Sequence, residues 1–103
     1  GVIGETTEEF IKKFRMDFGV IGISGIDLEG SLLDFDYREV RVAQAIIANS
    51  RQVLLAADHS KFGRKAMVRL GNIDQANHFF TDARPPAEIL QILTDHKVHL
   101  HIV

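Results

Sequence analysis

A short run of apolar residues, Val53 to Ala57, leads directly into the polar segment Asp58-His59-Ser60-Lys61. The run has no polar alternation, which is typical of a central strand in a parallel sheet whose two faces are both covered. In open α/β sheets, ligands bind in the crevice outside the carboxyl ends of the strands. The pattern predicts either a ligand-contacting loop at residues 58–61 or an ordinary polar turn after a core strand.

Strand and helix patterns alternate along the rest of the 103 residues, without a repeat or a linker. The alternation predicts one α/β domain over residues 1–103, built on a mostly parallel sheet with flanking helices. Asp36 and Glu39 have the spacing of a capping box and predict the start of a helix that ends near residues 49–50. The regular polar and apolar alternation of residues 97–103 predicts an edge strand with one wet face. Further strands are expected at residues 18–23, 67–70 and 78–81.

Composition excludes several classes of function. Twelve basic residues face fourteen acidic ones, and no basic cluster is present, so this chain is not expected to bind nucleic acid itself. The chain contains no cysteine, which excludes disulfides and thiol chemistry and is compatible with a cytoplasmic protein. No apolar stretch approaches the length of a membrane span, so no membrane partner is expected.

Three predicted strands are followed by an aspartate: Asp27, Asp58 and Asp82. If all three strands belong to one parallel sheet, these carboxylates lie on the same edge, which is how such folds build pockets. Aspartate is also common in turns, because its side chain accepts bonds from nearby backbone amides. The sequence leaves a shared pocket and three separate turns as alternatives.

Other residues of this edge also have two interpretations. Lys61 is the best single anion ligand in the chain, but it could be a solvated surface lysine. The segment Gly22-Ile-Ser-Gly25 could let the backbone approach a phosphate, although it is not a dinucleotide-binding fingerprint. Glu39 could be a pocket carboxylate or general base, or simply the capping-box partner of Asp36.

Three histidines near the end of the chain raise the question of a metal. His99 and His101 are expected on the same face of the last strand, with His96 close by in sequence. Zinc sites need three or four ligands with supporting contacts, and no further ligand is evident here. We therefore predict exposed polar positions on an edge strand and no metal site.

The segments DFGVIGISGID, GSLLDFDYREV, RQVLLAADHSKFGRKAMVRLG and FFTD, in this order, resemble the effector domain of DeoR-type bacterial transcriptional repressors. The resemblance spans essentially the whole chain. It implies a Rossmann-like sensor domain similar to ribose-5-phosphate isomerase and glucosamine-6-phosphate deaminase. The DNA-binding winged helix and the glycine-rich start of the sensor would precede Gly1, so the sensor is expected to be N-terminally truncated here.

The resemblance also implies partners. The effector would be a phosphorylated sugar or polyol, with glycerol 3-phosphate favoured by residues 58–64, 36–37 and 93–96. DNA would be bound only through the missing N-terminal domain, and the full-length protein is expected to form a homo-oligomer. Neither a cofactor nor a catalytic residue is expected.

Carried over residue by residue, the resemblance implies a set of effector-binding positions. Ser24, Gly25 and Asp27 would form the loop that meets the polyol. Arg38 and Glu39 occupy the place of the isomerases' Arg-Glu pair, and Asp58, Ser60 and Lys61 match their Asp-x-Ser-Lys. An isomerase or deaminase is the alternative function, although residues 34–37 replace the isomerases' glycine-rich run. A purely oligomer-forming domain is a third possibility.

Overall fold

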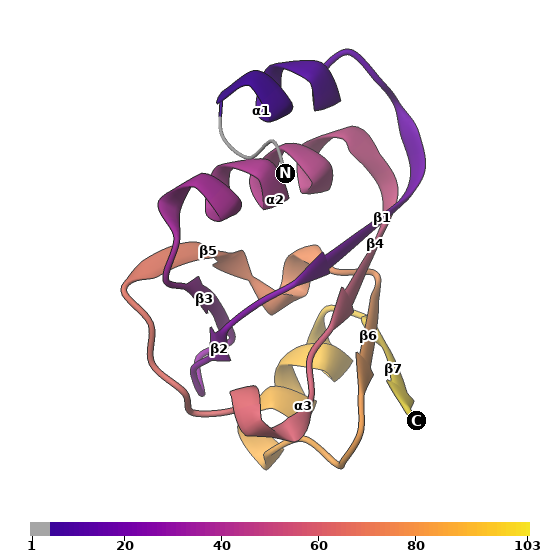
Figure 1. The fold of residues 1–103 in the computed structure, drawn as a ribbon. Coiled ribbons are helices and arrows are strands. Elements are labelled where there is room, and N and C mark those ends of the chain that lie inside the picture. The colour runs from indigo at the N-terminus through magenta and orange to yellow at the C-terminus, as the bar shows by residue number, and fades with distance from the viewer. Residues whose placement is uncertain (1–4) are drawn as a thin grey trace.

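The computed structural model describes residues 5–103 and contains two sheets. The larger sheet has four parallel strands in the order β1-β4-β6-β7, and the smaller one has three antiparallel strands in the order β2-β3-β5. Three α-helices and two 3₁₀ turns connect them (Figure 1). In chain order the elements are α1 (Glu5–Ile11), β1 (Met16–Gly22), β2 (Gly25–Ile26), β3 (Ser31–Asp34), α2 (Tyr37–Asn49), β4 (Ser50–Ala56), η1 (His59–Lys61), β5 (Val68–Asn72), η2 (Ile73–Gln75), β6 (His78–Thr81), α3 (Ala87–Asp95) and β7 (His99–Ile102).

The predicted α/β class and mostly parallel central sheet are confirmed. Asp36 caps α2 as predicted, because its Oδ1 accepts the backbone N–H of Arg38 at 2.9 Å. The side chain of Glu39 makes no reciprocal capping bond in the described part of the chain, so only half of the expected capping box forms. The last strand, β7, lies at the edge of the larger sheet, as its alternation indicated.

The smaller sheet was not predicted. Its first strand has two residues and its second has four, which is too short for a period to be visible in sequence. Gly30, with a φ of 87°, makes the turn that joins them. This sheet packs under α2 and takes the chain away from the edge of the larger sheet between β1 and α2 (Figure 1).

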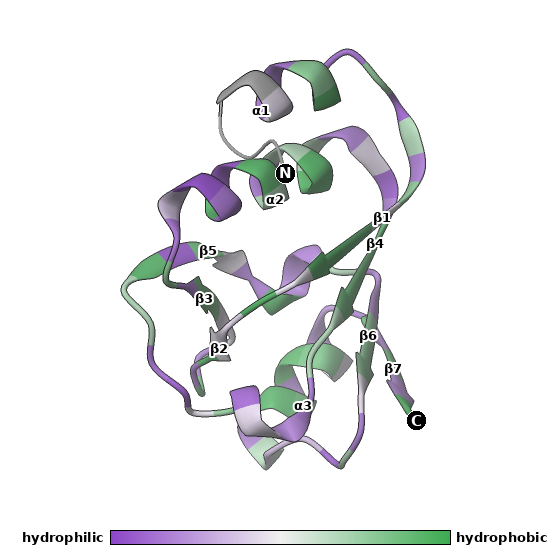
Figure 2. Cartoon of the chain, viewed as in Figure 1, coloured by the Kyte–Doolittle hydropathy of each residue, from purple (hydrophilic) through white to green (hydrophobic). Residues whose placement is uncertain are grey.

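The prediction that both faces of the strand at residues 53–57 are covered is wrong. Burial alternates along β4: Val53 and Leu55 are buried, whereas Leu54 is half-buried and Ala56 is exposed. The helices and the smaller sheet all lie on one side of the larger sheet (Figure 1). Much of β1, β4 and β6 has the green of hydrophobic residues (Figure 2), and the exposed Phe18 and Val20 of β1 show that apolar side chains also lie outside the covered side. An apolar run therefore appeared in sequence although only one face is covered by the described residues.

The core lies between the larger sheet and the elements on its covered side. The larger sheet contributes the fully buried side chains of Leu55 and Phe79 to this core. Helices α2 and α3 contribute the buried side chains of Val40 and Ile89. Phe62 packs edge-on against Phe79 with ring centroids 6.0 Å apart, which attaches the loop after β4 to this core. No helix among the described residues is long and apolar enough to cross a membrane.

Candidate functional site

Two of the three predicted aspartates lie on the same edge of the larger sheet. The parallel register pairs Gly22 with Ala56 and Ala56 with Phe80, so the chain leaves β1, β4 and β6 at one edge. Asp58 and Asp82 lie at this edge and line an open pocket of about 220 Å³.

Asp27 does not follow a strand of the larger sheet, so the structure favours the turn alternative for this residue. The two residues before it belong to β2 of the smaller sheet, which turns away from β1. Its Oδ1 accepts the backbone N–H of Glu29 at 3.0 Å and that of Ser31 at 2.9 Å. These bonds hold the turn between β2 and β3, as expected for an aspartate of an Asx turn.

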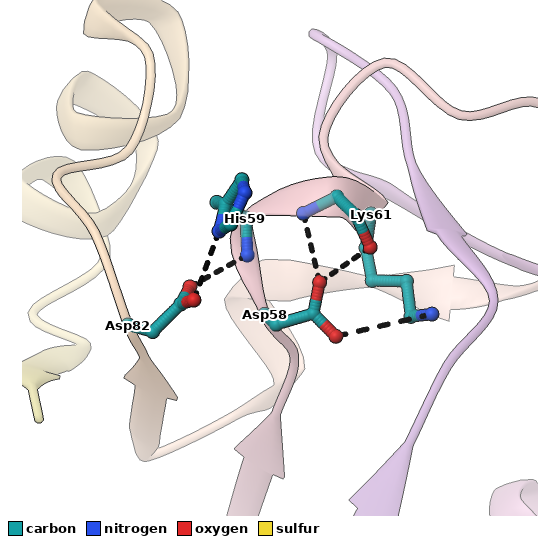
Figure 3. A network of polar contacts seen from close by, with 5 residues as sticks. Asp58, His59, Lys61 and Asp82 are labelled. Carbon is teal, nitrogen blue, oxygen red and sulfur yellow. Dashed lines mark hydrogen bonds and ion pairs between the residues drawn. The ribbon is translucent and has the colours of Figure 1, made fainter.

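Asp58 organises the 3₁₀ turn that carries Lys61. Its Oδ1 accepts the backbone N–H of Ser60 at 2.8 Å and also the Ser60 hydroxyl (Figure 3). The hydroxyl bond is the main reason that the pKa of Asp58 is lowered, so this carboxyl is ionised near neutral pH. Lys61 Nζ lies 4.0 Å from Asp58 Oδ2, and only 25% of the Lys61 side chain is exposed. Lys61 is therefore not a freely solvated lysine.

The same turn is attached to the end of β6 by a contact that the sequence did not reveal. The backbone N–H of His59 donates to Asp82 Oδ1 at 2.7 Å, and His59 Nδ1 lies 2.8 Å from Asp82 Oδ2 (Figure 3). The side-chain bond raises the pKa of His59 above its ordinary value of 6.5 and lowers the pKa of Asp82 below 3.8. The contact thus stabilises the imidazolium form of His59 paired with the Asp82 carboxylate.

The segment after Lys61 is docked on the smaller sheet. The backbone N–H of Gly63 donates to the carbonyl of Ile26 at 2.7 Å, and Phe62 forms an isolated parallel bridge with Ile26. A Cβ at Gly25 would overlap the carbonyl oxygen of Arg64, so this approach requires a glycine. The fold thereby places Gly25 and Ile26, from the first predicted loop, against residues 62–64, which directly follow the second predicted loop at residues 58–61.

A second group of predicted residues lies around the N-terminus of α2. The Ser24 hydroxyl donates to Asp34 Oδ1 at 3.0 Å, and Asp34 is buried. Asp34 and Glu39 line an open pocket of about 230 Å³ between β1 and α2, together with Gly22. Arg38 does not line this pocket: its guanidinium lies 3.3 Å from Asp36 and is largely exposed. Asp34 was not predicted, since no local pattern distinguishes it from a strand-end aspartate.

His99 and His101 share a face of β7 as predicted, and both stack on His78 of β6. His78 Nδ1 lies 3.0 Å from His101 Nε2. In residues 5–103, no group of three or more acidic, histidine or cysteine side chains has the geometry to hold a metal ion.

A further pocket of about 610 Å³ lies between α2 and β5. The side-chain amides of two of its lining residues already have partners: Gln44 donates to the carbonyl of Leu70, and Gln75 accepts from the backbone N–H of Asn72.

A family model described as the DeoR C-terminal sensor domain matches residues 1–83. The chain belongs to the DeoR family. A glycerol-3-phosphate regulon repressor from Escherichia coli is 58% identical over 99% of this chain and 40% of that relative. A protein with the same name from Haemophilus influenzae is 54% identical over 97% of the chain and 39% of its own length. The E. coli HTH-type transcriptional repressor CsqR is 36% identical over 97% of the chain and 38% of its own length.

This DeoR-family chain thus spans about two fifths of the length of the curated relatives it matches. Those relatives are named as transcriptional repressors, and the enzyme alternative has no support among them. The family model describes a sensor domain. This description agrees with the polar loops at the carboxyl ends of the strands of the larger sheet, where such folds bind ligands.

Proposed function

We propose that this DeoR sensor domain binds glycerol 3-phosphate and thereby relieves repression by the longer protein to which it belongs. The observation that carries the proposal is the placement of Lys61. Its ammonium lies 4.0 Å from Asp58 on a 3₁₀ turn at the carboxyl edge of the larger sheet, and the next residue, Phe62, pairs with Ile26 of β2. The names of the relatives that are 54–58% identical support glycerol 3-phosphate as the proposed effector.

The charges of the site suggest a division of roles. Lys61 would contact the phosphate, because its ammonium supplies a charge-assisted hydrogen bond and offsets the neighbouring Asp58. The backbone amides of Ser24 and of residues 59–61 already donate within the chain, so they would position the two loops and would not contact the phosphate. Glu39 and the Ser24–Asp34 pair would accept hydrogen bonds from the polyol hydroxyls, since ionised carboxylates are acceptors. Arg38 and Asp27 would act indirectly, through the start of α2 and the turn after β2.

The proposed mechanism is linkage. The effector would bind the DNA-free conformation more tightly than the DNA-bound one, and it would lower operator affinity by that difference. We place DNA binding and homo-oligomer assembly in the longer cytoplasmic protein. We also propose that the domain is not an enzyme, because residues 34–37 depart from the isomerase pattern next to Glu39.

Calorimetric titration of the intact repressor with glycerol 3-phosphate, ribose 5-phosphate and fructose 1-phosphate tests the effector. We expect glycerol 3-phosphate to bind most tightly. We also expect Lys61→Ala to weaken that binding by roughly ten- to a hundredfold, because one charge-assisted hydrogen bond contributes about 1.5–3 kcal/mol. Operator affinity without effector should not change.

Lys13→Ala is the matched control, because Lys13 is an exposed lysine that follows α1, away from the proposed site. It should bind the effector as the wild type does. If Lys61→Ala leaves the affinity within about twofold of wild type, Lys61 does not contact the phosphate. Glu39-dependent turnover of ribose 5-phosphate would support the enzyme alternative instead.

A further inference from the structure

Asp82 attaches the start of the Lys61 turn to a different strand. It follows β6, and it lies 23 residues from His59 in sequence. One of its carboxylate oxygens accepts the His59 backbone N–H, and the other faces His59 Nδ1. Two contacts from one carboxylate fix both the position of the backbone and the direction of the ring. In Figure 3 the Asp82 side chain points toward His59, on the opposite side of the turn from Lys61.

The other end of the turn is fixed by packing and backbone bonds. Phe62 contacts Phe79 in the core, and Gly63 bonds to Ile26 of the smaller sheet. Lys61 therefore lies between an apolar attachment and a polar one. The polar attachment is exposed: 67% of the His59 side chain and 44% of the Asp82 side chain are accessible. Removing it leaves the core packing of Phe62 in place.

We propose that Asp82 is a positioning residue for effector binding, which holds the Lys61 turn through His59 without touching the effector. This inference rests on the proposed function. Two features support it. Both oxygens of Asp82 are already engaged by His59. A free carboxylate at this edge would also repel a phosphate. When His59 is an imidazolium, its positive charge balances the negative charge of Asp82 and reduces that repulsion.

Asp82→Ala in the intact repressor tests the inference, with glycerol 3-phosphate as the probe. We expect the Kd to rise by about three- to tenfold, because Lys61 keeps its charge but loses its fixed position. Asp74→Ala is the matched control. Asp74 also faces a histidine, with His96 Nε2 at 3.8 Å, but this pair lies near η2 and does not contact the Lys61 turn. The control should lose a similar exposed pair and keep its Kd.

The pH profile separates positioning from a general loss of stability. Asp82 and Asp58 are the charged groups that face His59, and the Asp82 bond raises its pKa above 6.5. The attachment is therefore complete below pH 6.5 and weakens as the pH rises through that raised pKa. The ratio of variant to wild-type Kd should be largest near pH 6 and smaller at higher pH, where only the bond from the His59 backbone to Asp82 is independent of the ring's charge. Taking the ratio cancels the phosphate's own ionisation, whose pKa is about 6.

Amide hydrogen exchange of residues 59–63 without effector gives a second measurement. We expect faster exchange in Asp82→Ala and unchanged exchange in Asp74→Ala. A Kd within about twofold of wild type in Asp82→Ala would overturn the inference, whether or not exchange becomes faster. A wild-type protein that binds none of the three phosphates would contradict the proposed function instead. In that case unchanged exchange in Asp82→Ala would overturn the inference independently.

Discussion

At the scale of single residues, Gly25 lets the carbonyl of Arg64 lie directly against the backbone of β2. Gly25 was predicted to permit a close approach of the backbone to a phosphate. The structure places the carbonyl oxygen of Arg64 there instead, so the close approach is made by the chain itself. Asp82 shows the same limit: its partner His59 is 23 residues away, and their meeting depends on the order of the strands. Local patterns identify residue types suited to a task, whereas partners follow from the sheet topology.

Gly25→Ala should destabilise the domain by about 1–3 kcal/mol or more, because the added methyl group must displace a backbone carbonyl. Gly22→Ala is the control at a neighbouring strand position, where a Cβ meets only Ala56 O at 4.0 Å. It should stay within about 0.5 kcal/mol of wild type. Urea unfolding of the two variants measures both values. A Gly25→Ala protein as stable as wild type would show that residues 62–64 do not dock on β2 in solution.

At the scale of elements, prediction succeeded where a period could be read. The helix after Asp36 was located closely, because it carries a clear apolar period and a start signal. The strand at residues 78–81 was located as well. The short strands β2 and β3 were missed because two and four residues carry no period. The apolar run at residues 53–57 misled for a different reason: it shows that both faces of β4 are apolar, not that both are covered.

Leu54 and Leu55 provide a direct test, since they are neighbours on β4 and point to opposite faces. Leu55 is fully buried, so Leu55→Ala should cost about 2–5 kcal/mol. Leu54 is half-buried on the open face, so Leu54→Ala should cost clearly less. Thermal or urea unfolding measures the difference. Equal losses would mean that the second face is also packed in solution.

At the scale of the molecule, the open face of the larger sheet is the most unusual feature. Phe18 and Val20 of β1 are each 66% exposed, next to Leu54, and Phe80 lies on the same face. Parallel sheets are normally covered on both faces, and apolar patches of this kind are sites of association. The sequence predicted that these strands form a mostly parallel sheet. It could not predict which face of the sheet is covered, because both faces of β4 carry apolar residues.

We expect the 103-residue chain, produced alone, to self-associate through this face. Val20→Lys should reduce association, because a charge within the patch opposes its burial. Met67→Lys is the control, since Met67 is 93% exposed but lies in the loop before β5. Sedimentation velocity over a range of concentrations compares the two. Association that persists unchanged in Val20→Lys would place the contact elsewhere on the molecule.

The attachment of residues 58–63 at both ends has a mechanical consequence. These residues are bonded to Asp82 beyond β6 and to Ile26 of β2, and those two strands belong to sheets that share no strand ladder among the described residues. A displacement of Lys61 therefore strains both sheets together. Residues 58–63 are therefore held more stiffly than a surface loop that is attached to one sheet alone. A small force applied at this one side chain is distributed to both sheets.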